Sequence, residues 1–170
     1  MKKLLILSFF SLFGFAQNNP NPGYWQQNAN YKMDVNMNVK DYKYSGSQEL
    51  VYTNNSSDTL RKVFYHLYNN AFQPGSEMDI RLQTIADPDK RMVRTFKVAE
   101  KEIKESRIST LKPNEIGYLN IQNFKQNGLD AKTKVVGTVL EVTLNKPILP
   151  KQSVTFTLDF EGQVPLQVRR

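Results

Sequence analysis

The 170-residue sequence contains no cysteine. This absence excludes disulfide bonds, thiolate metal sites and a cysteine nucleophile from these residues. The fold must therefore be stabilised by its hydrophobic core, and a chain of this length is long enough to bury one.

Histidine is almost as scarce, because His66 is the only one. A zinc site takes three or four clustered histidine, cysteine or carboxylate ligands, so we predict no metal site in the chain. Serine catalysis needs a base beside the hydroxyl, and the sequence has no G-x-S-x-G elbow. His66 lies in an apolar run between Tyr65 and Leu67. We interpret it as a core or sheet-face residue and assign no catalytic residue.

Two groups of carboxylates offer oxygen ligands for calcium, Glu77 with Asp79 and Asp87 with Asp89. Neither group has the D-x-[DN]-x-[DN]-G spacing of a calcium loop. Asp87 precedes a proline, which is typical of a helix N-cap. We therefore interpret both groups as structural. No glycine-rich phosphate loop is present, so no cofactor is expected.

Lysine and arginine outnumber aspartate and glutamate, and the formal net charge is +7. Such an excess favours anionic partners such as nucleic acid or lipopolysaccharide. The basic residues are scattered, however, and no run alternates aromatic residues with arginine. We therefore expect a solvated basic surface and no nucleic-acid partner.

The amino terminus has the layout of a secretory signal peptide over residues 1–16. Lys2 and Lys3 precede an apolar stretch over residues 4–13, and small residues lie near Ala16. The apolar stretch is too short for a transmembrane helix, and no later segment is long and apolar enough to be one. The alternative is a buried helix at the start of the chain. We expect export to the periplasm, the medium or the cell surface.

Residues 17–30 are rich in asparagine, proline and glutamine and are expected to form a flexible lead-in. Apolar and polar residues then alternate over residues 31–39, which predicts a half-buried strand. The alternation changes phase at Lys40-Asp41, which indicates a bulge or tight turn. Polar residues over 53–58 predict a turn. The apolar run over residues 60–68 predicts a strand buried on both faces.

The middle of the chain has a different pattern, which predicts a helix over residues 87–105. Its apolar stripe has steps of four, three and four residues, and charged residues lie elsewhere around the helix. The stripe consists of Met92, Phe96, Ala99 and Ile103. Such a helix can lie on a membrane surface or pack on its own sheet. Mixed-sign charges favour the sheet.

Strand patterns return over residues 117–124, 139–144 and 154–160. Asn127-Gly128 is a strong hairpin signal, since both central residues of a type I′ turn need positive φ. A proline-containing turn is expected over residues 146–152. Six or seven short strands predict a mainly β fold. We expect a β-sandwich or saddle-like antiparallel sheet domain over residues 31–170 with one helical insertion.

Several motifs, in order, resemble the amino-terminal domain of the aminopeptidase N family of gluzincin zinc metallopeptidases (peptidase family M1). The family opens with a Y-x-G step between strands, an N-x-S-x-D-x-L turn and a strand ending in H-L. Here these are Tyr44–Gly46, Asn54–Leu60 and His66-Leu67. The closing half resembles a hairpin followed by F-x-x-x-V-P, here from Phe160 to Pro165. The segment "QPGSEMDIRLQTIADPDKR" resembles an insertion of Bacteroidetes members.

The resemblance implies a saddle-like β domain that shapes the substrate cleft beside a thermolysin-like catalytic domain. That second domain would carry H-E-x-x-H, a further glutamate and zinc, and would cleave peptide substrates at their amino terminus. None of these motifs is present here. On this interpretation the chain is truncated before its catalytic domain, and His66 belongs to the wall of the substrate cleft. The family's domain also lends a glutamine to the substrate, but neither Gln163 nor Gln167 matches that motif.

The rival interpretation is a free-standing envelope β-sandwich that binds glycan or a partner protein. Its stacking surfaces would come from five tyrosines, Tyr42, Tyr44, Tyr52, Tyr65 and Tyr68. Aromatic residues also favour strands for packing reasons alone.

Overall fold

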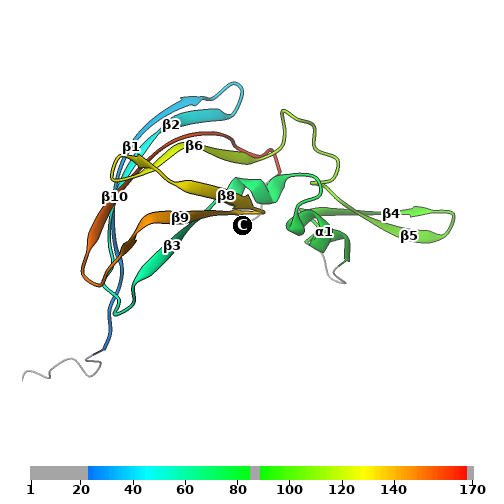
Figure 1. Ribbon diagram of the computed structural model, residues 1–170. Coiled ribbons are helices and arrows are strands. Elements are labelled where there is room, and N and C mark those ends of the chain that lie inside the picture. Colours follow the sequence, from blue (N-terminus) through cyan, green and yellow to red (C-terminus); the bar gives the residue numbers. More distant parts are fainter. Residues whose placement is uncertain (1–22, 85–88, 168–170) are drawn as a thin grey trace, which may run out of the picture.

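The computed structural model describes residues 23–84 and 89–167, which form two main antiparallel β-sheets (Figure 1). The larger sheet has the strand order β1-β2-β10-β6-β7, with bounds β1 (Asn28–Asn38), β2 (Lys43–Thr53), β10 (Ser153–Gln163), β6 (Tyr118–Gln126) and β7 (Leu129–Asp130). The smaller sheet has the order β3-β9-β8, with bounds β3 (Leu60–His66), β9 (Val139–Ile148) and β8 (Lys132–Val136). The larger sheet arches over the smaller one.

The hydrophobic core lies between the two sheets. Its fully buried members come from both, and they are Leu50, Leu67, Phe124, Leu140, Val142, Leu144, Ile148, Val154, Phe156 and Leu158. The predicted mainly β, antiparallel fold is confirmed. Within the described residues, no helix is long and apolar enough to cross a membrane.

The alternating segment after Asn30 forms β1, as predicted, but its apolar side is not buried. All eleven residues of β1 are exposed in the described chain. The smaller sheet packs against the middle strands of the larger one and leaves β1 uncovered, so the expectation of half-burial was wrong. The phase change at Lys40-Asp41 is the turn of the β1–β2 hairpin, in which Tyr42 has a φ of 56°.

The apolar run predicted to be buried on both faces forms β3, and this prediction was also wrong. β3 is an edge strand that pairs only with β9. Val63 and Tyr65 pack against the core, while Phe64 between them is 62% exposed. A 3₁₀ helix, η1 (Tyr68–Phe72), follows at once. β3 carries apolar side chains on both faces, but only one face packs against the larger sheet.

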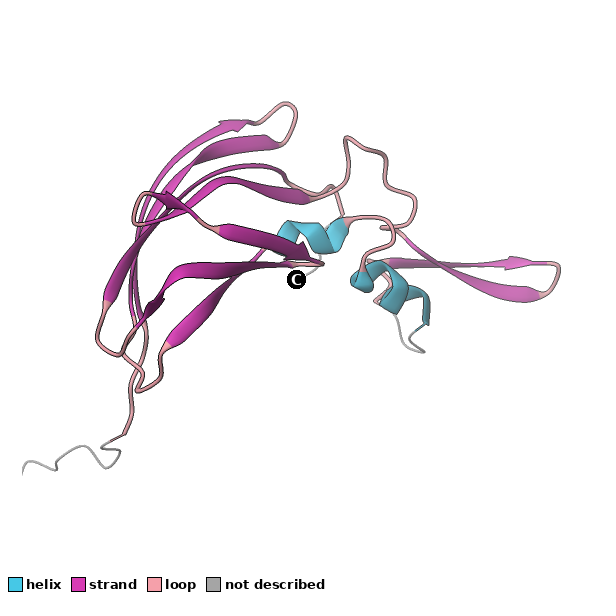
Figure 2. Cartoon of the chain, viewed as in Figure 1, coloured by secondary structure: helices cyan, strands magenta, loops and turns pink. Residues whose placement is uncertain are grey.

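The helix predicted over residues 87–105 is absent from the described part of that range, and a hairpin replaces it. The one α-helix of the described chain is α1 (Glu77–Thr84), which lies earlier. β4 (Val93–Val98) and β5 (Lys101–Ser106) pair antiparallel as a separate two-stranded sheet, the arm (Figure 2). The predicted N-cap, Asp87-Pro88, lies outside the described residues.

The misleading stripe has a physical explanation. Phe96 and Ile103 lie opposite each other across the hairpin, so they share one face without any helix. Ala99 and Glu100 form the turn with φ values of 46° and 68°. Such a turn favours Asn-Gly, because two consecutive residues need positive φ. Neither alanine nor glutamate indicates such a turn, so the apolar spacing of the segment led to the prediction of a helix.

A second, smaller core anchors the base of the arm. It consists of Leu82 from α1, Met92 and Val93 at the start of β4, and Ile108 just after β5. These four residues are separate from the core of the sandwich. The arm extends away from the sandwich in Figure 1.

The three strand patterns and the Asn127-Gly128 turn predicted for the last third of the chain are confirmed, whereas β8 was not predicted. Asn127 and Gly128 have φ values of 49° and 80° between β6 and β7. β9 continues through Pro147 to Ile148, so the turn after it begins later than predicted. β10 contains the alternating segment and lies in the middle of the larger sheet.

Candidate functional site

A groove of about 650 Å³ opens along one side of the sandwich, between β1 and β2 on one sheet and β3 on the other. The two edge strands β1 and β3 lie on this side, so no strand closes it within the described chain. Most of the lining is apolar or aromatic, and it includes Tyr31, Leu50, Tyr52, Val63, Phe64, Tyr65 and Tyr68. This groove is a large concavity with a mainly apolar lining.

His66 lies at the end of β3, in the wall of this groove. Its ring is exposed and stacks on Tyr68, with centroids 5.0 Å apart and planes 15° from parallel. The lining contains no serine or threonine hydroxyl that His66 could activate and no carboxylate that could orient its ring. The arrangement offers an aromatic surface for packing and lacks the parts of a hydrolytic site.

Two polar atoms in the groove have no hydrogen-bond partner in the described chain. They are Gln48 Nε2 and Tyr65 Oη, and both are buried. Burial also raises the pKa of the Tyr65 hydroxyl, and Tyr31 adds to this effect. Such atoms usually find partners, since an unpaired buried group costs free energy. The sequence did not indicate that Gln48 and Tyr65 would lack hydrogen-bond partners, because such partners depend on how the folded chain packs.

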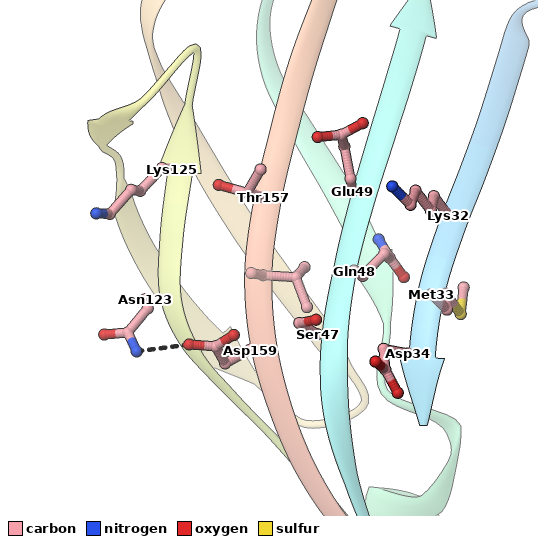
Figure 3. Close-up of a pocket in the computed structure, with 11 residues that line it drawn as sticks. Lys32, Met33, Asp34, Ser47, Gln48, Glu49, Asn123, Lys125, Thr157 and Asp159 are labelled. Atoms are coloured by element: carbon pink, nitrogen blue, oxygen red, sulfur yellow. Dashed lines mark hydrogen bonds between the residues drawn. The ribbon is translucent and has the colours of Figure 1, made fainter. Parts of the chain in front are cut away.

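The outer face of the larger sheet carries a polar hollow of about 620 Å³ (Figure 3). Charges of both signs line it, from Lys32, Asp34, Glu49, Lys125 and Asp159. Asn123 Nδ2 donates a hydrogen bond of 2.8 Å to Asp159. No group of three or more residues that could hold a metal ion occurs in the described chain. The hollow is a solvated polar sheet face.

The first pair of predicted carboxylates has a local structural role. Asp79 is buried and accepts hydrogen bonds from the Gly75 amide at 2.8 Å and from Gln83 at 3.3 Å. Its own amide donates to the Ser76 hydroxyl. Glu77 lies in the same first turn of α1, where a negative charge is favourable. These contacts fit the structural interpretation of the pair.

The second pair is only partly described, because Asp87 lies outside the described residues. Asp89 forms an ion pair with Arg91, in which the guanidinium donates to both carboxylate oxygens. This contact raises the pKa of Arg91.

Gln163 and Gln167 are both engaged near the carboxyl end. The Gln163 side chain is buried and donates to the carbonyl oxygens of Pro113 and Ile116, at 3.1 and 2.7 Å. Gln167 Nε2 donates to the Arg91 carbonyl oxygen at 2.7 Å. Gln163 therefore fastens β10 to the loop before β6, and Gln167 fastens the chain to the base of the arm.

The arm presents an apolar face, part of which the sequence pattern assigned to a helical stripe. Phe96, Val98 and Ile103 are exposed on it. Arg94 and Glu105 form an ion pair nearer the base on the same face. A two-stranded hairpin is marginally stable alone, so an exposed apolar face here suits contact with another structure.

No protein-family model and no curated protein matches the sequence. Among solved structures, the chain is similar to an M1 zinc metallopeptidase from Deinococcus radiodurans, with 12% identity, a TM-score of 0.44 and 78% of the chain covered. A two-domain M1 zinc metallopeptidase bound to L-tryptophan shows 12% identity, a TM-score of 0.46 and 83% coverage. The chain spans 19% and 21% of the length of these structures.

Proposed function

We propose that this chain is the non-catalytic amino-terminal β domain of an exported zinc aminopeptidase-like metallopeptidase. In that protein it would form one wall of the substrate cleft against a thermolysin-like domain. The order of the motifs in the sequence supports the proposal. The described residues contain no ligand set for zinc, so zinc and the peptide-cleaving residues would belong to the other domain.

The arm is the observation that carries the proposal. Its apolar residues Phe96, Val98 and Ile103 are exposed, although four fully buried residues of the described chain form the small core at its base. The last described residues pass beside its base, where Gln167 donates to the Arg91 carbonyl oxygen. A domain that continues from the carboxyl end would therefore meet the arm first. Burying this face would supply the support that the hairpin lacks.

The family-like motifs have structural roles that suit a scaffold. Leu67 of the H-L pair is buried, and its amide donates to the Thr138 carbonyl oxygen at 2.7 Å. Gly46 of the Y-x-G step lies between Val35 and Phe160 in the larger sheet. Leu67 belongs to the core, and Gly46 belongs to the pairing of β1, β2 and β10. His66 would then form part of the wall of the groove.

The first experiment is to sequence the native gene beyond the codon for Arg170. We expect the frame to continue and to encode H-E-x-x-H with a later glutamate. The complete protein should then cleave amino-terminal residues from peptides in a zinc-dependent way, and the 170-residue chain alone should not. A stop codon directly after Arg170, or wild-type cleavage by the chain alone, would contradict the proposal.

Variants of the complete protein test the arm itself. Phe96→Lys with Ile103→Lys should loosen the domain contact and speed limited proteolysis between the domains. Leu129→Lys is the control, because Leu129 is also an exposed apolar residue, at 59% against 41% for Phe96 and 38% for Ile103, but lies on β7, in the larger sheet of the sandwich. Equal effects of the arm variant and the control would contradict a contact through the arm. If the gene instead ends after Arg170, the rival interpretation of a free-standing glycan- or protein-binding module takes over.

A further inference from the structure

The outer edge of β1 is an unpaired template for another strand. β1 pairs with β2 through eleven consecutive residues without a register shift, and no described strand pairs with its other edge. Its outward N–H and C=O groups are therefore available for hydrogen bonds. Natural edge strands are usually protected by proline, a bulge, a short length or charged side chains such as lysine. β1 has no proline, no bulge and eleven residues, and its two charges, Lys32 and Asp34, are of opposite sign.

The two faces of this edge differ in character. One face carries apolar side chains that are all at least half exposed, Tyr31 (57%), Met33 (52%), Val35 (54%) and Met37 (50%). The other face carries the charges Lys32 and Asp34, one on each side of Met33, and asparagines towards both ends. A continuous row of exposed apolar side chains is typical of an interaction surface.

The sequence of β1 is complementary to itself in the antiparallel direction. Met33 is the central residue of Asn28–Asn38, so a second copy centred on the same residue pairs along the whole strand. The resulting pairs are Met33 with Met33, Lys32 with Asp34, Tyr31 with Val35, Asn30 with Asn36, Ala29 with Met37 and Asn28 with Asn38. Every pair joins like chemistry or opposite charges, and symmetry makes the Lys32–Asp34 pair occur twice.

We propose that two copies of this chain pair through β1, antiparallel, about a two-fold axis at Met33. The ten strands of the two larger sheets then form one continuous sheet. A two-fold interface places the same patch on both subunits, so a self-complementary strand is what it requires. Cross-strand pairs of an aromatic with a β-branched residue, such as Tyr31 with Val35, stabilise a sheet, as do opposite charges.

The charges select this register over its neighbours. A slide of two residues in one direction places Lys32 opposite Lys32, and in the other direction Asp34 opposite Asp34. Like charges directly opposite each other are unfavourable. A slide of one residue places the apolar face against the polar one, because side chains alternate with a period of two. Longer slides shorten the ladder.

Pairing also changes the surroundings of the groove. A two-fold axis perpendicular to the larger sheet keeps both smaller sheets on the same side. The two grooves then face each other across the new ladder, and Val35 of the second copy covers part of Tyr31. The inference does not depend on the proposed function, since it uses only the edge and sequence of β1.

Cysteine cross-linking tests the register directly, because the chain has no cysteine of its own. In the paired strands, the two copies of Met33 have Cα atoms about 4.5–5.5 Å apart, within disulfide reach. Met33→Cys should give a disulfide-linked dimer under mild oxidation. Val35→Cys is the matched control, since its two copies lie four residues apart along the strands, about 13 Å. It should remain monomeric on a non-reducing gel.

Charge exchange tests the pairing without a cross-link. Sedimentation equilibrium of the purified chain from about 1 to 100 μM should show a monomer–dimer equilibrium. Lys32→Glu or Asp34→Lys alone should weaken the dimer about tenfold, because each creates two like-charge pairs. The double variant Lys32→Glu/Asp34→Lys should restore the dimer. Circular dichroism and thermal melting of each variant show whether the fold is retained.

Three results would overturn the proposal. The first is a monomer at every concentration. The second is a dimer that cross-links through Val35→Cys as readily as through Met33→Cys, which would indicate another register or surface. The third is a Met33→Cys variant that stays reduced and is shielded from thiol reagents, which would show that another partner or part of the protein covers β1.

Discussion

The ring of Tyr65 meets the ring of Phe124 edge to face, with centroids 5.4 Å apart and planes at 81°. Phe156 lies against both rings, with centroid distances of 6.4 and 5.5 Å. These three rings belong to β3, β6 and β10, so they join the two sheets. Only the Tyr65 hydroxyl does not fit this apolar environment.

Replacing Tyr65 with phenylalanine should stabilise the chain. The hydroxyl is buried without a partner in the described chain, and its removal relieves a desolvation cost of about 1 kcal/mol while keeping the ring contacts. Tyr44→Phe is the matched control, because the Tyr44 hydroxyl accepts a hydrogen bond of 2.8 Å from Asn69. That variant should lose about 1 kcal/mol. Urea unfolding measures both, and a destabilised Tyr65→Phe would reveal an unrecognised partner of the hydroxyl.

Stability should fall in alkaline solution. Burial raises the pKa of the Tyr44, Tyr52 and Tyr65 hydroxyls, most strongly for Tyr65. The unfolded chain therefore loses these protons first, near pH 10. The stabilisation from their neutral form is complete below about pH 10 and decreases as the pH rises above it. Urea unfolding at pH 9 and pH 11 measures the decrease, which should be smaller in Tyr65→Phe. An equal decrease in both proteins would rule out Tyr65 as its source.

Gly46→Ala should destabilise the larger sheet. A Cβ atom at this position would collide with the Asp34 carbonyl oxygen of β1 and lie 2.8 Å from the Phe160 ring. The collision with backbone cannot be relieved by a side-chain rotation, so a loss of about 2–3 kcal/mol is expected. Gly23→Ala is the control, because nothing lies within 4 Å of its Cβ. Thermal melting of both variants tests the close approach, and a neutral Gly46→Ala would contradict it.

Asn54→Ala should be more harmful than Asn55→Ala. The Asn54 side chain is fully buried, donates to the carbonyl oxygens of Asp58 and Ile148, and accepts from Ser56. Its loss leaves these groups unpaired, which costs about 2–4 kcal/mol in total. Asn55 makes one exposed side-chain bond, to the Gln26 carbonyl oxygen, and should cost at most about 1 kcal/mol. Equal losses in urea unfolding would show that the network does not hold this turn.

Sequence patterns predicted the strands better than their surroundings. The alternation in β1 and β10 and the Asn127-Gly128 sequence are local features. Local features are enough to predict where a strand or a tight turn forms. Burial depends on what covers a strand. β1 and β10 have the same alternating pattern, yet β10 lies in the middle of the larger sheet, where the smaller sheet covers one face, and β1 lies at the uncovered edge.

The arm shows where local patterns mislead. Its apolar residues repeat at helical spacing, but the same spacing places Phe96 opposite Ile103 when the chain turns at Ala99 and Glu100. The sequence did not predict the groove either, because the groove forms only when the edge strands β1 and β3 of two different sheets lie on the same side of the sandwich. His66 was singled out because it is unique, and its exposed place in a groove wall could not be read from its neighbours.

The separation of the two cores has a consequence for local unfolding. The small core at the base of the arm has no buried residue in common with the core of the sandwich; it consists of Leu82, Met92, Val93 and Ile108. Its packing can therefore be lost while the sandwich remains intact. Backbone amides of β4 and β5 should then exchange with deuterium well before those of β2 and β10. We therefore expect two cooperative units of unequal stability on one chain, of which the weaker is the one that extends outwards.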